Sequence, residues 1–116
     1  MTQEGKELLL KDLCARLPYG VKVTWDGLYP ITLTPSIYGE LWKEKRDQNI
    51  PKVYLRQMSS MTEEEIETYR IIIKSLLEKS VTDNVATLYN FLNSKHLDYN
   101  ALIPQGLALQ VPEGMY

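Results

Sequence analysis

Four glutamates lie close together in the middle of the chain, at Glu63, Glu64, Glu65 and Glu67. Carboxylate oxygens are preferred ligands of divalent cations, so the cluster raises the question of a metal site. Successive helical residues point about 100° apart, however, and the four side chains would not converge on one ion. Thr62 and Glu65 instead have the spacing of a capping box, in which each side chain accepts a hydrogen bond from the other residue's backbone N–H. The sequence therefore predicts a helix start here and no metal site.

A lone cysteine and a lone histidine, Cys14 and His96, could form a nucleophile and a base, with Asp98 to orient the imidazole. A second interpretation explains both residues without chemistry. Cys14 falls on the apolar side of a predicted helix, where a free cysteine packs as a small hydrophobe, and His96 lies at a helix end that favours a cation. We therefore predict no catalytic residue and no cofactor, and we keep a thiol-dependent enzyme as the weakest alternative.

Basic and aromatic residues are concentrated between residues 42 and 56. Such a surface can neutralise phosphates and stack on unpaired bases, which would indicate nucleic-acid binding. Glu44, Asp47 and a pI near 5.4 make the basic signal weak, so nucleic-acid binding remains an alternative. We expect an accessory or adaptor protein that binds another protein or itself, through residues 37–56 or through the C-terminal tail. The residues of the predicted partner surface are Trp42, Lys43, Lys45, Arg46, Lys52, Tyr54 and Arg56.

The composition is that of one folded domain covering residues 1–116, with 44% apolar and 24% charged residues. The longest apolar runs are far shorter than the roughly 20 residues that cross a bilayer, so no membrane protein is expected. The first residues mix charges with apolar side chains and lack the core of a secretory signal. A single cysteine allows no intramolecular disulfide. The expected location is therefore the cytoplasm.

The first half of the chain should form a helix followed by strands. Apolar residues between 9 and 17 have the spacing of one helix face, with Lys11, Asp12 and Arg16 on the opposite side. Residues 21–25 alternate as in a half-buried strand, and Asp26-Gly27 favours a two-residue hairpin turn into an antiparallel strand over 28–34.

Pro30 would confine this second strand to the edge of a sheet. The 37–48 segment suits a helix or a strand, and a helix capped by Ser36 is favoured. Residues 52–58 predict a third strand.

The second half should be mostly helical. Apolar stripes predict two helices, one starting at Thr62 and one at Thr82 or Asp83, packed as an antiparallel pair. The tail after residue 97 is apolar enough to be ordered, and residues 107–111 could dock as an edge strand or in a groove. The predicted fold class is α+β: an N-terminal helix, a small antiparallel sheet of about three strands with an intervening helix, a C-terminal helical pair and an ordered tail.

Three blocks of the sequence carry a resemblance: "KELLLKDLCARLPYGVKV", "YLRQMSSMTEEE" and "LNSKHLDYNALIPQGLALQVPEGMY". Together they cover about half of the chain. They resemble a family of small uncharacterised proteins from Bacteroides-type gut bacteria, carried in part by prophage or other mobile regions. The resemblance implies a cytoplasmic protein in such a setting. It brings no catalytic or binding residue to this chain.

Overall fold

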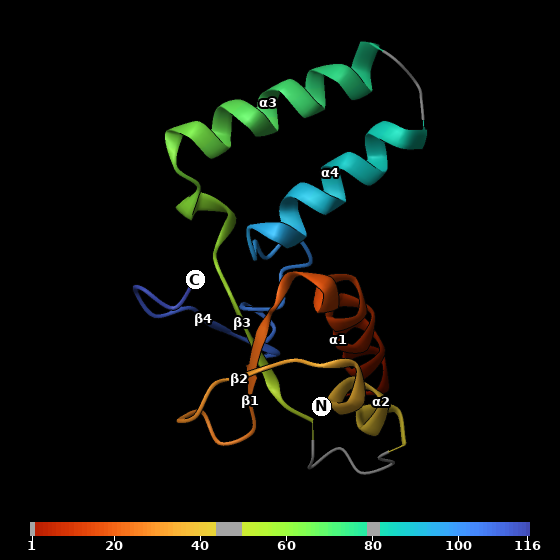
Figure 1. The fold of residues 1–116 in the computed structure, drawn as a ribbon, viewed down its shortest axis with the longest axis vertical. Coiled ribbons are helices and arrows are strands. Elements are labelled where there is room, and N and C mark those ends of the chain that lie inside the picture. Colours follow the sequence, from red (N-terminus) through yellow and green to blue (C-terminus); the bar gives the residue numbers. More distant parts are fainter. Residues whose placement is uncertain (1, 44–49, 79–81) are drawn as a thin grey trace.

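The computed structural model of the chain describes residues 2–43, 50–78 and 82–116. Within these residues it has four α-helices, four β-strands and two short 3-10 helices (Figure 1). In chain order the helices and strands are α1 (Gln3–Arg16), β1 (Lys22–Thr24), β2 (Ile31–Thr32), α2 (Pro35–Lys43), β3 (Lys52–Leu55), α3 (Glu63–Glu78), α4 (Thr82–Ser94) and β4 (Ala108–Gln110). None of the described helices is long and apolar enough to span a bilayer.

The strands form one mixed sheet in the order β2-β1-β3-β4. β1 is antiparallel to β2 and β3, whereas β3 and β4 are parallel. A parallel pair needs a long crossover connection, which here comprises α3, α4 and the segment after them. The α+β class is confirmed. The sheet differs from the expected one because the tail adds a fourth strand, parallel to β3, and so docks as the edge strand that residues 107–111 suggested.

The hydrophobic core lies between the sheet and the first two helices, α1 and α2 (Figure 1). The α1 residues Leu9, Leu10 and Leu13 are 0–2% exposed, as their spacing predicted. Thr2 caps α1 by accepting a 2.9 Å hydrogen bond from the Gly5 backbone N–H. The other core residues are Val21, Val23, Leu33, Leu41, Val53, Leu55, Leu102, Leu107 and Ala108.

The charged side of α1 is not where its sequence pattern placed it. Asp12 and Arg16 are 1% and 0% exposed, and Cys14, expected on the apolar stripe, is exposed. The Arg16 Nε donates to Asp12 Oδ1 at 2.6 Å, and its Nη2 donates to the Leu97 carbonyl at 2.6 Å. Asn100 donates to Asp12 Oδ2 at 2.9 Å. The prediction failed because the two opposite charges neutralise each other and can therefore lie inside, against the segment that follows α4.

The connection between β1 and β2 is longer than the predicted two-residue turn. β1 ends at Thr24 and β2 begins at Ile31, so residues 25–30 connect them. Only Gly27 has a positive φ there, whereas the expected turn type needs positive φ at Asp26 too. Asp26 instead bends the chain with its carboxylate, as described below. The antiparallel return is confirmed, and β2, directly after Pro30, is an edge strand.

The segment over 37–48, which suited a helix or a strand, is helical as far as it is described. Residues 37–43 belong to α2, and residues 44–48 lie outside the described residues. The favoured helix is thus confirmed for its described part, but its cap is Thr34, not Ser36. The Thr34 hydroxyl accepts a 3.3 Å hydrogen bond from the Ile37 backbone N–H. Pro35 fits the first helical position because its missing N–H would have no partner there.

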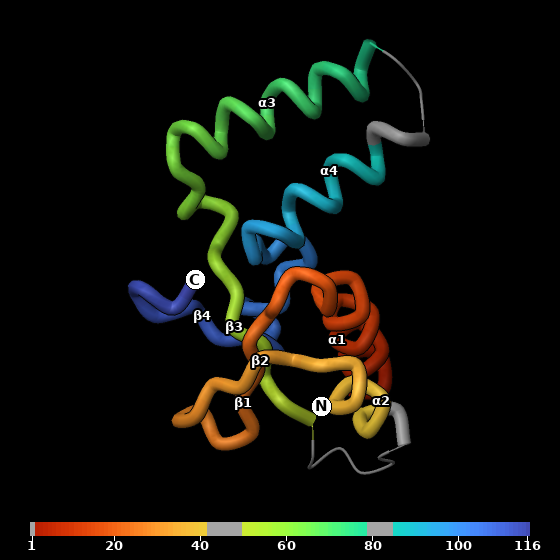
Figure 2. The backbone as a smooth tube through the Cα atoms, in the orientation of Figure 1, coloured from red at the N-terminus to blue at the C-terminus, as the bar shows by residue number. Residues whose placement is uncertain are grey.

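The predicted helical pair, α3 and α4, forms an arm that projects from one end of the molecule (Figures 1 and 2). All 16 residues of α3 are described, and none is buried. Among the described residues, the core cluster includes none from either helix of the arm. The Cα radius of gyration is 15.0 Å, compared with about 13 Å for a compact chain of this length. Except at the C-terminal end of α4, where Leu92 and Asn93 are each 3% exposed, the arm therefore lies outside the packed body.

We predict that Asp12→Ala lowers the free energy of unfolding by about 3–5 kcal/mol, because it leaves the buried Arg16 guanidinium without its counter-charge. Urea unfolding followed by circular dichroism measures the change. The exposed neighbour Lys11 is the matched control, and Lys11→Ala should change stability by less than about 0.5 kcal/mol.

Replacing both charges with apolar side chains, in Asp12→Leu with Arg16→Met, should recover most of the lost stability. A loss below about 1 kcal/mol in Asp12→Ala would show that the pair does not hold α1 as described.

Candidate functional site

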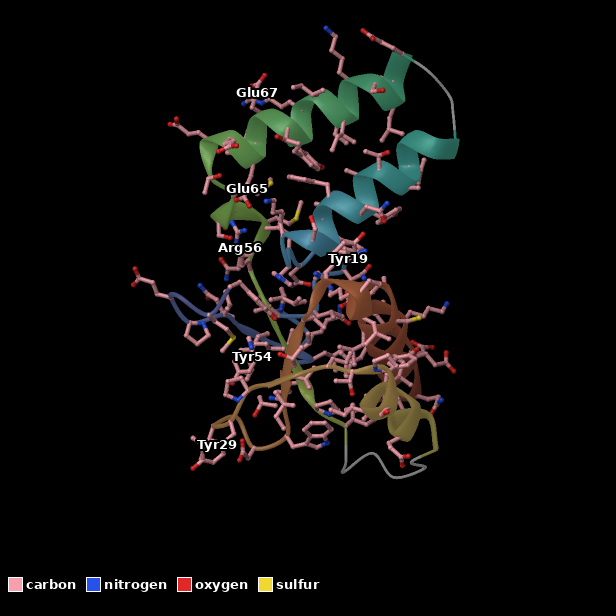
Figure 3. The ribbon with its side chains drawn as sticks, viewed as in Figure 1. Tyr19, Tyr29, Tyr54, Arg56, Glu65 and Glu67 are labelled. Carbon is pink, nitrogen blue, oxygen red and sulfur yellow. The ribbon has the colours of Figure 1, made fainter. Side chains whose placement is uncertain are left out.

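The arm joins the body around Arg56, the residue directly after β3. Its backbone N–H donates to the His96 carbonyl at 2.7 Å, and its own carbonyl accepts from the Asp98 N–H at 2.8 Å. Its guanidinium donates to both carboxylate oxygens of Glu65, at 2.9 and 2.7 Å, and to the Ser60 carbonyl at 3.0 Å. Arg56 therefore links the end of β3 to both ends of the arm (Figure 3).

Glu65 completes the capping box that the sequence predicted. The Thr62 N–H donates to Glu65 Oε1 at 2.9 Å, and the Glu65 N–H donates to Thr62 Oγ1 at 3.2 Å. The hydrogen bonds from Arg56, opposed by burial and aided by Thr62, lower the pKa of Glu65 to about 2. One carboxylate thus serves the helix cap and the ion pair at once. The ion pair was missed because Arg56 lies outside the helix whose start was being predicted.

His96 lies at the base of the arm and is 9% exposed. Its ring stacks on Tyr116, with 3.6 Å between centroids and 11° between planes. Burial, followed by the nearby charges of Arg16, Arg56 and Lys95, lowers its pKa from 6.5 to about 4. The imidazole is therefore neutral at pH 7. The expectation of a cationic histidine at a helix end was wrong because three cations and the loss of water outweigh the helix dipole.

The C-terminal residue Tyr116 fastens the tail across the sheet. Its hydroxyl donates to the Tyr54 carbonyl at 2.8 Å and accepts from the Lys22 N–H at 2.8 Å. Burial, the largest cause, raises the pKa of this hydroxyl to about 12. Two hollows of about 240 and 400 Å³ adjoin Arg56 and Tyr116. Of the ionisable groups that line them, Arg56 is paired with Glu65 and the imidazole of His96 carries no charge, whereas Glu113 lines the first hollow and Lys95 the second.

The structure does not bring the proposed thiol and imidazole together. Cys14 lies about 200° around α1 from Asp12 and from Arg16, whose side chains face the segment after His96. Asp98 does not orient the imidazole either. Its carboxylate accepts hydrogen bonds from the backbone N–H groups of residues 102 and 103, at 2.8 and 2.9 Å, and so caps the turn before Pro104.

The predicted basic and aromatic surface is only partly described. Lys45 and Arg46, and the side chains of Trp42 and Lys43, lie outside the described part. Tyr54 is 5% exposed within the sheet, and Arg56 is engaged with Glu65, whereas Lys52 is exposed. Tyr54 therefore has no free ring face to stack on a base. Protein or nucleic-acid contact through this segment stays a prediction. Across the described ranges, no three His, Cys, Asp or Glu side chains gather as a metal site requires.

Outside the arm, most of the exposed large apolar side chains of the described residues lie on or beside the connection between β1 and β2, which we call, with Trp25 and Ile31, the 25–31 loop. Trp25, Leu28, Tyr29 and Ile31 are 44%, 75%, 72% and 45% exposed. Figure 3 shows Tyr29 pointing into solvent at the end of the molecule opposite the arm. An apolar turn was itself a signal, because turns are normally polar, and the sequence analysis used only its Asp-Gly pair.

Asp26 holds this loop in one conformation. A single carboxylate oxygen of Asp26 accepts hydrogen bonds from the Leu28 and Tyr29 backbone N–H groups, at 2.7 and 3.0 Å, and from the Thr24 hydroxyl at 3.0 Å. The two backbone bonds are the main reason that the pKa of Asp26 is lowered. The exposed apolar side chains therefore sit on a braced turn, which reduces the entropy lost when a partner binds.

Comparison with protein-family models, with curated proteins and with solved structures gives no match in any of the three.

We predict that acid destabilises the fold through His96. Its pKa is 6.5 unfolded and about 4 folded, so between these values the unfolded chain binds a proton that the folded chain does not. This contribution to stability is complete above pH 6.5 and is lost as the pH falls towards 4. The free energy of unfolding should drop by about 2 kcal/mol between pH 7.5 and pH 5.

Urea unfolding at these two pH values measures the effect in the wild type and in His96→Phe, which keeps an aromatic ring against Tyr116. His96→Asn is a second non-titrating variant, and asparagine tolerates the positive φ of 58° at this position. Both variants should lose most of the pH dependence. If the free energy of unfolding depends equally on pH in the wild type and in both variants, then groups other than His96 cause the dependence. Glu65 contributes only below about pH 4.5, where its own stabilisation is lost.

Proposed function

We propose that this chain is a small cytoplasmic accessory or adaptor protein that works by binding another protein through the 25–31 loop. One observation carries the proposal: four large apolar side chains are exposed on a short turn that Asp26 braces. Solitary apolar residues are common on protein surfaces, whereas a gathered group that includes tryptophan and tyrosine is typical of binding sites.

The geometry of the loop favours an apolar pocket on the partner. Leu28 and Tyr29 are the two most exposed of the four and lie next to each other at the tip, so they would enter the pocket. Trp25 and Ile31 flank them and would exclude water around the contact. The adjoining β2 is an edge strand whose two residues are both exposed, which leaves the partner room beside the loop.

The resemblance of three sequence blocks to prophage-borne or mobile-element proteins supports a setting in which small accessory proteins are common. Catalysis is not part of the proposal, since the cysteine and the histidine lie on different sides of α1.

We predict that Leu28→Asp with Tyr29→Asp abolishes partner binding and leaves the fold intact, because both side chains are more than 70% exposed. A photo-crosslinking amino acid at position 29, introduced in cells that naturally express the chain, should trap one defined protein. Affinity purification with purified wild type and variant then measures the loss, which should exceed about 100-fold for two buried anchors.

Ile71→Asp is the matched control, because Ile71 is an apolar residue 61% exposed on α3, far from the loop. It should retain the partner in full. If no protein is trapped at position 29, or if the trapped protein binds the loop variant as well as the wild type, the proposed function is wrong.

A further inference from the structure

We infer that the arm is a self-association surface, and that two copies of this chain pair through their α3–α4 hairpins into an antiparallel four-helix arrangement. This inference goes beyond the proposed binding of another protein and does not depend on the 25–31 loop. It begins from a contrast between helices of similar length. In α1 three leucines are 0–2% exposed, whereas none of the residues of α3 is buried.

Among its described residues, the arm has a partly exposed apolar face, which we call its open face. On α3 it comprises Ile66, Ile73 and Leu77, which lie within about 40° of each other around the helix. On α4 it comprises Val85 and Tyr89, again about 40° apart. Ile66 and Ile73 are half-buried, whereas Leu77, Val85 and Tyr89 are 83%, 44% and 47% exposed. The Tyr89 ring also packs on Tyr99 of the body, with 5.4 Å between centroids, so the fully open part of the face lies towards the tip of the arm.

The opposite broad face of the hairpin is polar and hollowed. Its hollow, of about 210 Å³, is lined by Thr62, Glu64, Glu65 and Thr68 of the α3 side and by Phe91 and Lys95 of the α4 side. Around α3, Thr68 lies about 140–180° from the three residues of the open face, so the two broad faces are distinct. Apart from Ile71 and Phe91, the apolar side chains named here are collected on one side of the arm, as in a helical hairpin that packs against another layer.

The charges beside the open face indicate that a second copy is the occupant. Glu63, Glu67, Arg70 and Lys74 are exposed and follow one another along the outer edge of α3. Figure 3 shows Glu67 directed away from α4. Acidic residues come first along the helix and basic residues second, so an antiparallel α3 of a second copy sets Glu63 against Lys74 and Glu67 against Arg70.

One register places an opposite charge beside each of these four residues. Both pairs are symmetric about the same point of α3, between residues 68 and 69. In a parallel arrangement each residue would face its own copy, and every contact would be repulsive. A two-fold axis also makes the contact self-complementary and closed, as in most homodimers.

The size of the arm sets the strength that we expect. The helices α3 and α4 have 16 and 13 residues and are about 24 and 20 Å long. With a width of about 10 Å each, the hairpin face of two copies covers roughly 900 Å² in total, close to the lower limit for a specific interface. The dimer should therefore be weak and concentration-dependent.

Sedimentation equilibrium from micromolar to near-millimolar concentration tests the inference. A reducing agent is needed, since the exposed Cys14 could otherwise form an intermolecular disulfide. The wild type should show a monomer–dimer equilibrium. Leu77→Glu with Val85→Glu places charge on the open face and should raise the dissociation constant at least 100-fold. Ile71→Glu, on the outer side of the same helix, should leave it unchanged.

Charge exchange tests the orientation. Glu67→Arg and Arg70→Glu should each weaken the dimer by about tenfold, because each sets like charges against each other twice. The double variant restores opposite charges and should return to near the wild-type dissociation constant. Circular dichroism at the same concentrations shows whether each variant keeps its helices.

A wild type that remains monomeric at the highest concentration overturns the inference. The inference is also wrong if Ile71→Glu raises the dissociation constant as much as the open-face variant does. It is wrong as well if the double charge-exchange variant dimerises no better than the two single variants. None of these results would bear on the partner of the 25–31 loop. The loop variant is tested by its binding to another protein and not by self-association.

Discussion

The position of the arm relative to the body depends on the hydrogen bonds of Arg56. Among its described residues the arm adds only Leu92, at the C-terminal end of α4, to the buried apolar side chains, so its position is fixed where it leaves and re-enters the body. Arg56 lies at both places, with backbone hydrogen bonds to the segment after α4 and side-chain hydrogen bonds to Glu65 and Ser60 at the start of α3. Charge-assisted, bidentate hydrogen bonds are directional, so this contact orients the arm as well as attaching it.

A second polar contact fixes the segment after α4, which contains Leu97 and Asn100 and which we call the platform. Arg16 and Asp12 reach it from α1 through Leu97 and Asn100, in a part of the molecule without access to water. A buried ion pair adds little net stability over apolar packing, but it is satisfied in only one arrangement of its partners. Burial, aided by the cations of this region, lowers the pKa of His96 and keeps its ring uncharged where it stacks on Tyr116. Charge here specifies how α1, the platform and the tail fit together.

Local signals allowed most of the elements to be predicted from the sequence. The helix over 9–17, the capping box at Thr62 and the antiparallel return after residue 25 each depend on residues a few positions apart. Apart from the turn at Asp26 and the cap of α2, the failures involve partners distant in sequence. Asp12 and Arg16 look solvent-facing until Asn100, 88 positions away from Asp12, supplies a buried partner. The parallel pairing of β4 and the ion pair of Arg56 have no local signature either. For the candidate surfaces, the sequence located aromatic residues but not their exposure, since Tyr54 is buried and Tyr29 is not.

The two apolar surfaces lie at opposite ends of a molecule 45 Å long, with the open face on the arm and the 25–31 loop beyond the sheet (Figure 1). Joining two arms would leave both loops free and pointing away from the joint. A dimer of this form presents two identical binding sites, so a partner that is itself dimeric or repeated binds the second site at a high effective concentration. Affinity for such a partner would then rise with the concentration of this chain, even though each loop is small. A weak self-association is sufficient for that purpose, because a partner that engages both loops stabilises the dimer by the same free energy that it gains.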